Sequence, residues 1–226
     1  MNTLTKKIDE IIQETERIWE RNPFAGTFRE IPYDRELYGI ASGVKCTPPI
    51  TLSSVLDKLF LLAAEDHELE ITLPNHFHFT FLALSFPQWE KLADLPVEHK
   101  ELLFLSGKIL HRVNWKLYHL RLVALNNTLL LVGTPDETSD LLRNAYAHSI
   151  LVSGWRKHLV ARYRGLSTPP LLWHSTLARY KREFFSPALR NLFREFKQYD
   201  YGEICLGNPT LYFLNYNWTK MTELGE

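Results

Sequence analysis

Apolar and polar positions recur with two different periods along the chain, and each period predicts a kind of element. Apolar residues three or four apart predict helices over residues 4–20, 51–64, 137–163 and 186–196. Alternation or a short apolar run predicts strands over residues 36–44, 75–84, 111–125, 128–132, 171–180, 201–206 and 209–217. Residues 86–95 suit a short helix or turn, and a polar connector follows as far as residue 110.

Helix signals and connection lengths refine this order. Pro and Gly in NPFAG, residues 22–26, end the first helix, and Asp136 is placed to cap the helix that begins at Glu137. Ser153 and Gly154 mark a candidate break in that helix. Helices and strands interleave, but many connections are short enough for hairpins. The chain is therefore predicted to be an α+β fold, not a doubly wound parallel sheet.

The strand over residues 75–84 contains the unusual run HFHFTF. Side chains two apart in a strand point to the same face. One face then carries His76, His78 and Thr80, and the other carries Phe77, Phe79 and Phe81. The phenylalanine face suits the core. The histidine face loses hydrogen bonds to water if it is buried, so it either opens into a cleft or finds partners.

A second strand, over residues 171–180, repeats part of this pattern. His174-Ser175-Thr176 has the same H-x-T spacing as His78-Phe79-Thr80, so His and Thr again share one face of an extended run. Two such tripeptides are unremarkable by counting alone, but both lie in apolar strands that follow a proline and a helical segment. A duplicated lobe, each half of which contributes one such strand to a shared cleft, explains the repeat.

The composition of the chain limits which binding partners and which cellular compartment are expected. Lys+Arg and Asp+Glu number 26 each, so the whole chain has no charge excess to attract a large nucleic acid. Residues 156–197 nonetheless hold ten Lys/Arg against two Glu. These charges either steer a phosphate-bearing ligand or belong to a solvated helix face. Cys46 and Cys205 alone make no disulfide framework or zinc knuckle. With no bilayer-spanning apolar run and no apolar signal core, we expect a cytoplasmic monomer without membrane contact.

The longer string HSTLAR, residues 174–179, is similar to the H-x-T-L-A-R motif of the two-histidine (2H) phosphoesterase superfamily, which includes LigT-like RNA 2′,3′-cyclic phosphodiesterases. The order of elements resembles that family over residues 36–220, ending with ICLGNPTLYFLNY. The resemblance implies a bilobal fold, with two pseudo-symmetric antiparallel-sheet lobes, outer helices and a central cleft. Residues 1–30 then form an N-terminal helical extension, and residues 31–226 form a single phosphoesterase domain.

The resemblance also implies the chemistry. His78 and His174 would be catalytic, one taking a proton from water or a ribose hydroxyl and the other giving a proton to the leaving oxygen. Imidazole suits both roles because its unperturbed pKa of about 6.5 lets either form exist near neutral pH. Thr80 and Thr176 would donate hydrogen bonds to the phosphate oxygens. The family favours His78 as the acid, whereas the residues themselves leave the roles interchangeable. No metal or other cofactor is then required.

Arg179 and His76 complete the predicted substrate-binding set. By resemblance, Arg179 binds substrate or forms a structural ion pair, although strict alternation points it away from His174. His76 shares the predicted face of His78 and is expected at the rim of the cleft. The expected partner is a nucleotide or short RNA that carries a cyclic phosphate or another phosphodiester.

Two other functions fit parts of the pattern. The same cleft would serve a binding module that holds a nucleotide without hydrolysing it. Alternatively, His76 and His78 have the H-x-H spacing of metal ligands, which predicts a metal enzyme if further ligands are nearby. No Asp or Glu adjoining the strand stands out as such a ligand, so the hydrolase remains the leading interpretation.

Overall fold

The computed structural model describes residues 3–29 and 34–225, which form two antiparallel sheets. The first sheet has the strand order β3 (His78–Ala83), β1 (Tyr38–Lys45), β8 (Thr210–Asn215) and β9 (Met221–Glu223). The second has the order β2 (Leu69–Ile71), β6 (Trp173–Tyr180), β5 (Thr128–Pro135), β4 (Trp115–Leu125) and β7 (Ile204–Gly207). The predicted α+β class is confirmed.

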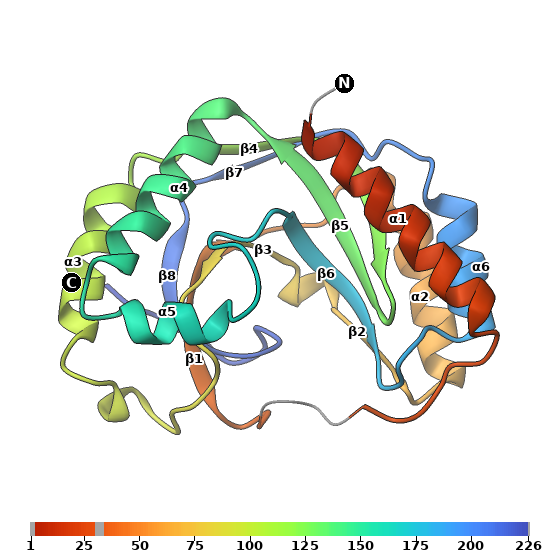
Figure 1. Ribbon diagram of the computed structural model, residues 1–226, viewed down its shortest axis with the longest axis horizontal. Helices are drawn as coiled ribbons and strands as arrows, with labels where there is room; N and C mark the ends of the chain where they lie inside the picture. Colours follow the sequence, from red (N-terminus) through yellow and green to blue (C-terminus); the bar gives the residue numbers. More distant parts are fainter. Residues whose placement is uncertain (1–2, 30–33, 226) are drawn as a thin grey trace.

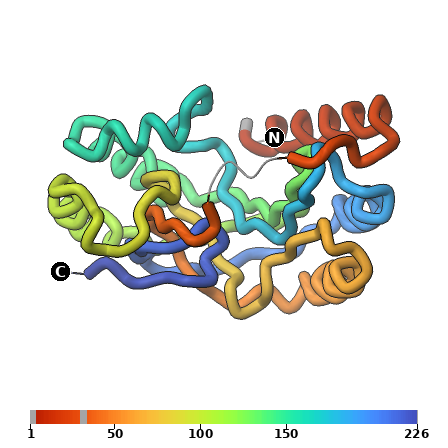
Figure 2. The backbone as a smooth tube through the Cα atoms, turned by 90° about the horizontal axis from the view of Figure 1, so that it is seen from below, coloured from red at the N-terminus to blue at the C-terminus, as the bar shows by residue number. Residues whose placement is uncertain are grey.

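The helices gather at the two ends of the molecule, with the strands between them (Figures 1 and 2). At one end lie α1 (Thr3–Arg21), α2 (Ser53–Glu65) and α6 (Pro187–Phe196), which pack on the second sheet. At the other end lie α3 (His99–Leu110), α4 (Glu137–Leu151) and α5 (Arg156–Arg162), and α3 and α4 contact the first sheet. This is the bilobal arrangement with outer helices that the resemblance implies.

The local signals for the long helical region are confirmed. Asp136 caps α4, since its carboxylate accepts a hydrogen bond from the backbone N–H of Ser139 at 2.7 Å. The predicted break is present, because α4 ends at Leu151 and α5 begins only at Arg156. The break redirects the chain, so that α5 and the segment after it run toward β6.

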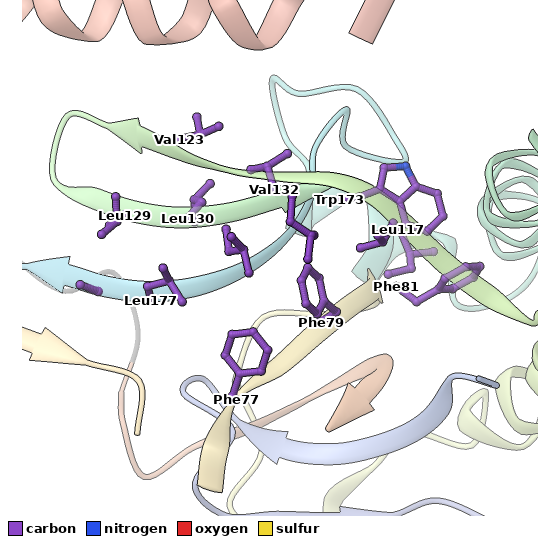
Figure 3. Close-up of a cluster of buried hydrophobic side chains, with 14 of the residues drawn as sticks. Phe77, Phe79, Phe81, Leu117, Val123, Leu129, Leu130, Val132, Trp173 and Leu177 are labelled. Carbon is purple, nitrogen blue, oxygen red and sulfur yellow. The ribbon is translucent and has the colours of Figure 1, made fainter. Parts of the chain in front are cut away.

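The phenylalanine face of the first histidine strand lies in the core, as predicted. Phe77, Phe79 and Phe81 are each at most 1% exposed and point toward the strands of the second sheet (Figure 3). Phe79 and Phe81 both contact the ring of Trp115, and Phe81 also contacts Trp173. Burying a phenylalanine side chain contributes about 1.5–3 kcal/mol relative to exposure. This packing therefore holds β3 against the second sheet.

Three of the elements were not predicted. Residues 99–110 form α3, whereas the sequence was interpreted as a polar connector; Leu102 and Leu110 of this helix are buried against the fold. The strands β2 and β9 have only three residues each, too few to show a period. The predicted strand over residues 75–84 also proves shorter, because residues 74–76 form a 3₁₀ turn, η2 (Pro74–His76).

The N-terminal helix packs firmly on the second sheet. Ile8, Ile12, Thr15 and Trp19 form its buried stripe. The Thr15 hydroxyl donates to the Ala124 carbonyl at 2.9 Å, and the Trp19 indole N–H donates to the Asn126 carbonyl at 3.0 Å. The predicted boundary between an extension and the main domain, at residues 30 and 31, lies outside the described residues.

Candidate active site

The two histidine strands meet where the two sheets adjoin. β3 belongs to the first sheet and β6 to the second, and they lie side by side in the centre of the molecule (Figure 1). Their contact brings His78, Thr80, His174 and Thr176 to the wall of one cavity of about 560 Å³. The two far-apart H-x-T segments are thus brought together by the fold, in a space large enough for a nucleotide-sized ligand.

The ring of His78 is fixed on two sides. Its Nδ1 lies 2.8 Å from the His76 carbonyl oxygen, so Nδ1 carries the proton and Nε2 is left for a ligand. The indole of Trp218 stacks on one face of the ring, with ring centres 4.2 Å apart and planes 9° from parallel. His78 is only 5% exposed, and burial lowers the pKa of its imidazole to about 3, assisted by the nearby Arg179 charge.

His174 has a related but looser environment. The backbone of Leu172, two residues earlier, acts on the His174 ring as the backbone of His76 acts on that of His78. The Nδ1 atom of His174 is buried and has no hydrogen-bond partner among the described residues. Burial, followed by the charges of Arg179, Arg143 and Arg162, lowers the pKa of His174 to about 4. Both imidazoles are therefore neutral at pH 7 in the free protein.

Arg179 faces the cavity because a β-bulge interrupts the alternation of β6. Thr176 pairs with Leu130 of β5, but Ala178 pairs with the next residue, Leu129, so that Leu177 is the extra residue. Beyond the bulge, Arg179 pairs with Thr128 and returns to the face of Thr176. Its guanidinium donates to the Thr176 hydroxyl at 3.3 Å and lies over the ring of Tyr216. Strict alternation was thus misleading for this residue.

The first histidine strand has a bulge at the corresponding place. Thr80 pairs with Gly43 of β1 and Leu82 with Ser42, so Phe81 is the extra residue, one position after the H-x-T triplet. Ala83 then occupies the place that Arg179 has on β6. The repeat therefore extends from the tripeptide to the backbone irregularity that follows it. The two halves differ in that only the second contributes a charge at this position.

His76 does not share the cavity of the catalytic candidates. It lies in η2 rather than on β3, so the alternation that placed it beside His78 does not apply. It lines a neighbouring pocket of about 230 Å³ together with Arg179 and Asn217. Its carbonyl, not its side chain, contacts His78. The predicted position of His76, on the face of His78, is corrected to this adjoining pocket.

Sequence reasoning missed several residues of the cavity wall. The turn between β8 and β9 supplies Tyr216 and Trp218, which contact Arg179 and His78 respectively. Trp218 has a φ of 60°, a conformation that costs a bulky residue free energy, so the turn holds the indole in place against that cost. Gly43 makes room for it, since a Cβ there would lie 2.7 Å from the indole.

Two arginines of the wall were also missed. Arg162 belongs to the basic stretch 156–197, but Arg143 lies outside it. Arg143 occupies the buried stripe of α4, which also contains Ser139, Tyr146, Ala147 and Ile150. A charged residue on the apolar stripe of a helix is a signal that could have identified it.

Four of the ten basic residues of this stretch form ion pairs away from the cavity. Arg182 pairs with Glu68, and Lys197 and Arg194 contact Glu16. Lys157 pairs with Glu98. Of the ten basic residues in 156–197, Arg162 and Arg179 are the two that line the cavity, within the described chain. The charge that faces a ligand is therefore smaller and more localised than the sequence count indicates.

The metal interpretation lacks ligands. In the described part of the chain, no group of three or more His, Cys, Asp or Glu side chains is arranged to hold a metal ion. His76 and His78 line different pockets.

No helix within residues 3–29 and 34–225 is long and apolar enough to cross a membrane.

Comparison with known proteins identifies the fold. Neither a protein-family model nor a curated protein matches the chain. Among solved structures, E. coli LigT complexed with 3′-AMP is 14% identical, with a TM-score of 0.50, covering 83% of this chain and 94% of that chain. LigT in apo form is 16% identical (TM-score 0.49; 83% and 95%), and TT0787 of Thermus thermophilus is 15% identical (0.49; 82% and 94%). The chain therefore shares the fold of E. coli LigT, as the H-x-T-L-A-R motif predicted.

Proposed function

We propose that the protein is a phosphodiesterase that hydrolyses a cyclic phosphate, either a 2′,3′-cyclic nucleotide or the end of a short RNA. The observation that carries the proposal is that both imidazoles line one cavity, each two residues from a threonine on the same strand. The fold shared with LigT, a protein crystallised with 3′-AMP, supports a nucleotide ligand.

The residues divide the reaction between them. A neutral imidazole takes a proton from water, and the resulting hydroxide attacks phosphorus. The bond from phosphorus to the 3′ oxygen breaks, and the other imidazole protonates that oxygen, leaving a 2′-phosphate. The hydroxyls of Thr80 and Thr176 donate to the non-bridging oxygens, where negative charge grows. Arg179, which already contacts the Thr176 hydroxyl, adds a positive charge at the same place. The family resemblance favours His78 as the acid.

Binding of the substrate favours protonation of the histidine that acts as the acid. Both imidazoles have pKa values far below 7 in the free protein, to which the positive charge of Arg179 contributes. A bound phosphodiester brings a negative charge beside them, which favours the protonated form and raises the pKa of the acid. The proton is thus taken up with the substrate, and the site holds it where the leaving oxygen is formed.

The first prediction tests this assignment by removing each histidine. We expect His78→Ala and His174→Ala each to lower kcat/KM for 2′,3′-cyclic AMP about 10²–10⁴-fold, the range for general acid–base groups. Product 2′-AMP is quantified by chromatography, and circular dichroism checks the fold. His111→Ala, at an exposed histidine outside the cavity, is the matched control. Full activity in either cavity variant would refute the assignment.

A nucleotide-binding module without turnover is the second candidate. It is favoured by one observation, namely that neither imidazole is protonated at neutral pH in the free protein. Thermal shift with a panel of nucleotides, run beside the product assay, separates the two functions. Stabilisation without product at any pH between 5 and 8 would favour the binding module.

A further inference from the structure

The wall of the cavity that contains the two histidines carries more positive charges than the single negative charge of one phosphodiester. This wall contains Arg143, Arg162 and Arg179, and within the described residues it contains no Asp or Glu. A cyclic phosphodiester carries one negative charge near neutral pH. Arg179, beside the Thr176 hydroxyl, is placed to meet that charge. The other two arginines are then left facing the cavity with no negative group of the reaction to bind.

Arg143 is built into the wall rather than attached to the surface. It is 2% exposed and lies flat against the ring of Trp173, at 3.7 Å from the ring centre. It donates to the carbonyls of Pro170 at 2.7 Å and Leu172 at 3.5 Å, while its Nε is buried without a hydrogen-bond partner. No carboxylate of the described residues forms an ion pair with it. The Asp140 carboxylate, one turn earlier on α4, offsets part of the burial cost only at a distance. A buried guanidinium without a directly paired carboxylate is costly, which points to an anionic ligand.

Arg162 and Tyr163 extend the same wall from the end of α5. Arg162 is half-buried over the ring of Phe86, and it forms no ion pair or side-chain hydrogen bond with the described residues. The Tyr163 hydroxyl accepts a hydrogen bond from the Ala83 N–H at 3.1 Å, so its own proton is free to donate. Arg143 donates to the carbonyls of Pro170 and Leu172, which precede His174 closely in the chain. This geometry places Arg143 on the His174 side of the cavity, and the charges of Arg143 and Arg162 both lower the pKa of His174.

We infer that Arg143, Arg162 and Tyr163 bind a second phosphoryl group, so that the preferred ligand carries one phosphoryl group besides the phosphodiester at the histidines. The inference rests on the proposed function for the identity of the first group. The second group is either a terminal phosphate monoester on the 5′ position of the nucleotide or the phosphodiester that links it to a preceding nucleotide. Both present the anionic oxygens that guanidinium groups bind by charge-assisted hydrogen bonds.

Equilibrium binding tests the inference without depending on turnover. Isothermal titration calorimetry compares 3′-AMP with adenosine 3′,5′-bisphosphate and with the dinucleotide ApAp, which carries the second group as a diester. We expect the bisphosphate to bind about 10- to 100-fold more tightly than 3′-AMP, as charge-assisted hydrogen bonds imply. A gain with the bisphosphate alone assigns the site to a terminal monoester, and a gain with both ligands assigns it to either form of 5′-phosphoryl group.

Arg162→Gln should lower the ratio of the two dissociation constants at least threefold, because the variant removes one of the two guanidinium groups of the second site. Its effect on the charge near His174 applies to both ligands and cancels in the ratio. Arg164→Gln, two residues along the chain and exposed, should keep the full ratio. Equal affinity of the wild-type protein for 3′-AMP and the bisphosphate would overturn the inference, as would an unchanged ratio in Arg162→Gln. Failure of the hydrolase proposal would appear separately, as absence of product from every cyclic substrate.

Discussion

At the residue scale, the environment of His78 is the most closely determined feature of the site. One ring nitrogen contacts the His76 carbonyl, one ring face lies on Trp218, and the remaining nitrogen is left for a ligand. Because Trp218 covers the ring, water cannot solvate the protonated imidazole of His78, and this lowers the pKa of His78. Under the proposed function, Trp218 is a positioning residue, which acts on the reaction through His78.

The second prediction concerns this stack. Trp218→Leu should raise the pKa of His78 from about 3 toward the ordinary value, since water regains access to the ring, and should lower kcat/KM about tenfold through loss of orientation. An NMR titration of the imidazole carbons measures the pKa. Trp218→Phe, which keeps an aromatic ring in place, should restore most of the wild-type value. A pKa that stays at its wild-type value in the leucine variant would contradict the positioning role.

At the element scale, one turn serves both halves of the site. The β8–β9 turn carries Trp218, which covers His78 of the first sheet, and Tyr216, which lies beside Arg179 of the second. Asn215 holds this turn, because its Oδ1 accepts from the N–H groups of Thr219 and Lys220, both at 3.0 Å. Asn215 is 4% exposed, so its amide lies inside the turn, whereas Thr219 and Lys220 are exposed.

The third prediction concerns this turn. Asn215→Ala should lower the free energy of unfolding by about 1–3 kcal/mol, because two hydrogen bonds worth about 0.5–1.5 kcal/mol each are lost, and should lower activity through both aromatic contacts. Urea denaturation and the cyclic phosphate assay measure the two effects. Asn217→Ala is the matched control in the same turn, since the Asn217 side chain accepts, among the described residues, from the Thr219 hydroxyl alone. Loss of stability with full activity would show that the turn does not position the site.

The irregular backbone of β3 and β6 shows why the direction of some side chains could not be predicted from the sequence. The alternation of His78 with Phe77 and Phe79 was sufficient to assign the core face of β3. The same rule misplaced Arg179, because a bulge depends on how β6 pairs with β5 and leaves no reliable mark in the sequence. His76 was misplaced for a related reason, since Pro74 begins a 3₁₀ turn that delays the start of the strand.

At the scale of the whole molecule, the buried histidines couple stability to pH. In the folded protein His78 and His174 titrate at about 3 and about 4, whereas in the unfolded chain they titrate near their ordinary value. Between these values the unfolded chain binds protons that the folded protein does not. The free energy of unfolding therefore falls as the pH is lowered through about 6.5 and continues to fall down to the folded pKa values.

The fourth prediction follows from this coupling. Between pH 7 and pH 5 each of the two histidines should cost about 1–2 kcal/mol of stability. Urea denaturation at both pH values measures the loss, and His78→Gln with His174→Gln should remove most of it. His111→Gln, at an exposed histidine, should leave the loss unchanged. A double variant with the wild-type loss would show that other groups carry the pH dependence.

The sequence by itself determined the class of fold, most of its helices and longer strands, and the two H-x-T strands, because these depend on local spacing and on a short motif. It did not reveal α3, whose apolar residues form the runs 102–105 and 109–110 and so show no helical spacing, or the three-residue strands. Only the tertiary structure decided which residues surround the two histidines. Trp218, Arg143 and Arg162 reach the cavity because distant segments pack together there, and no local period records that packing.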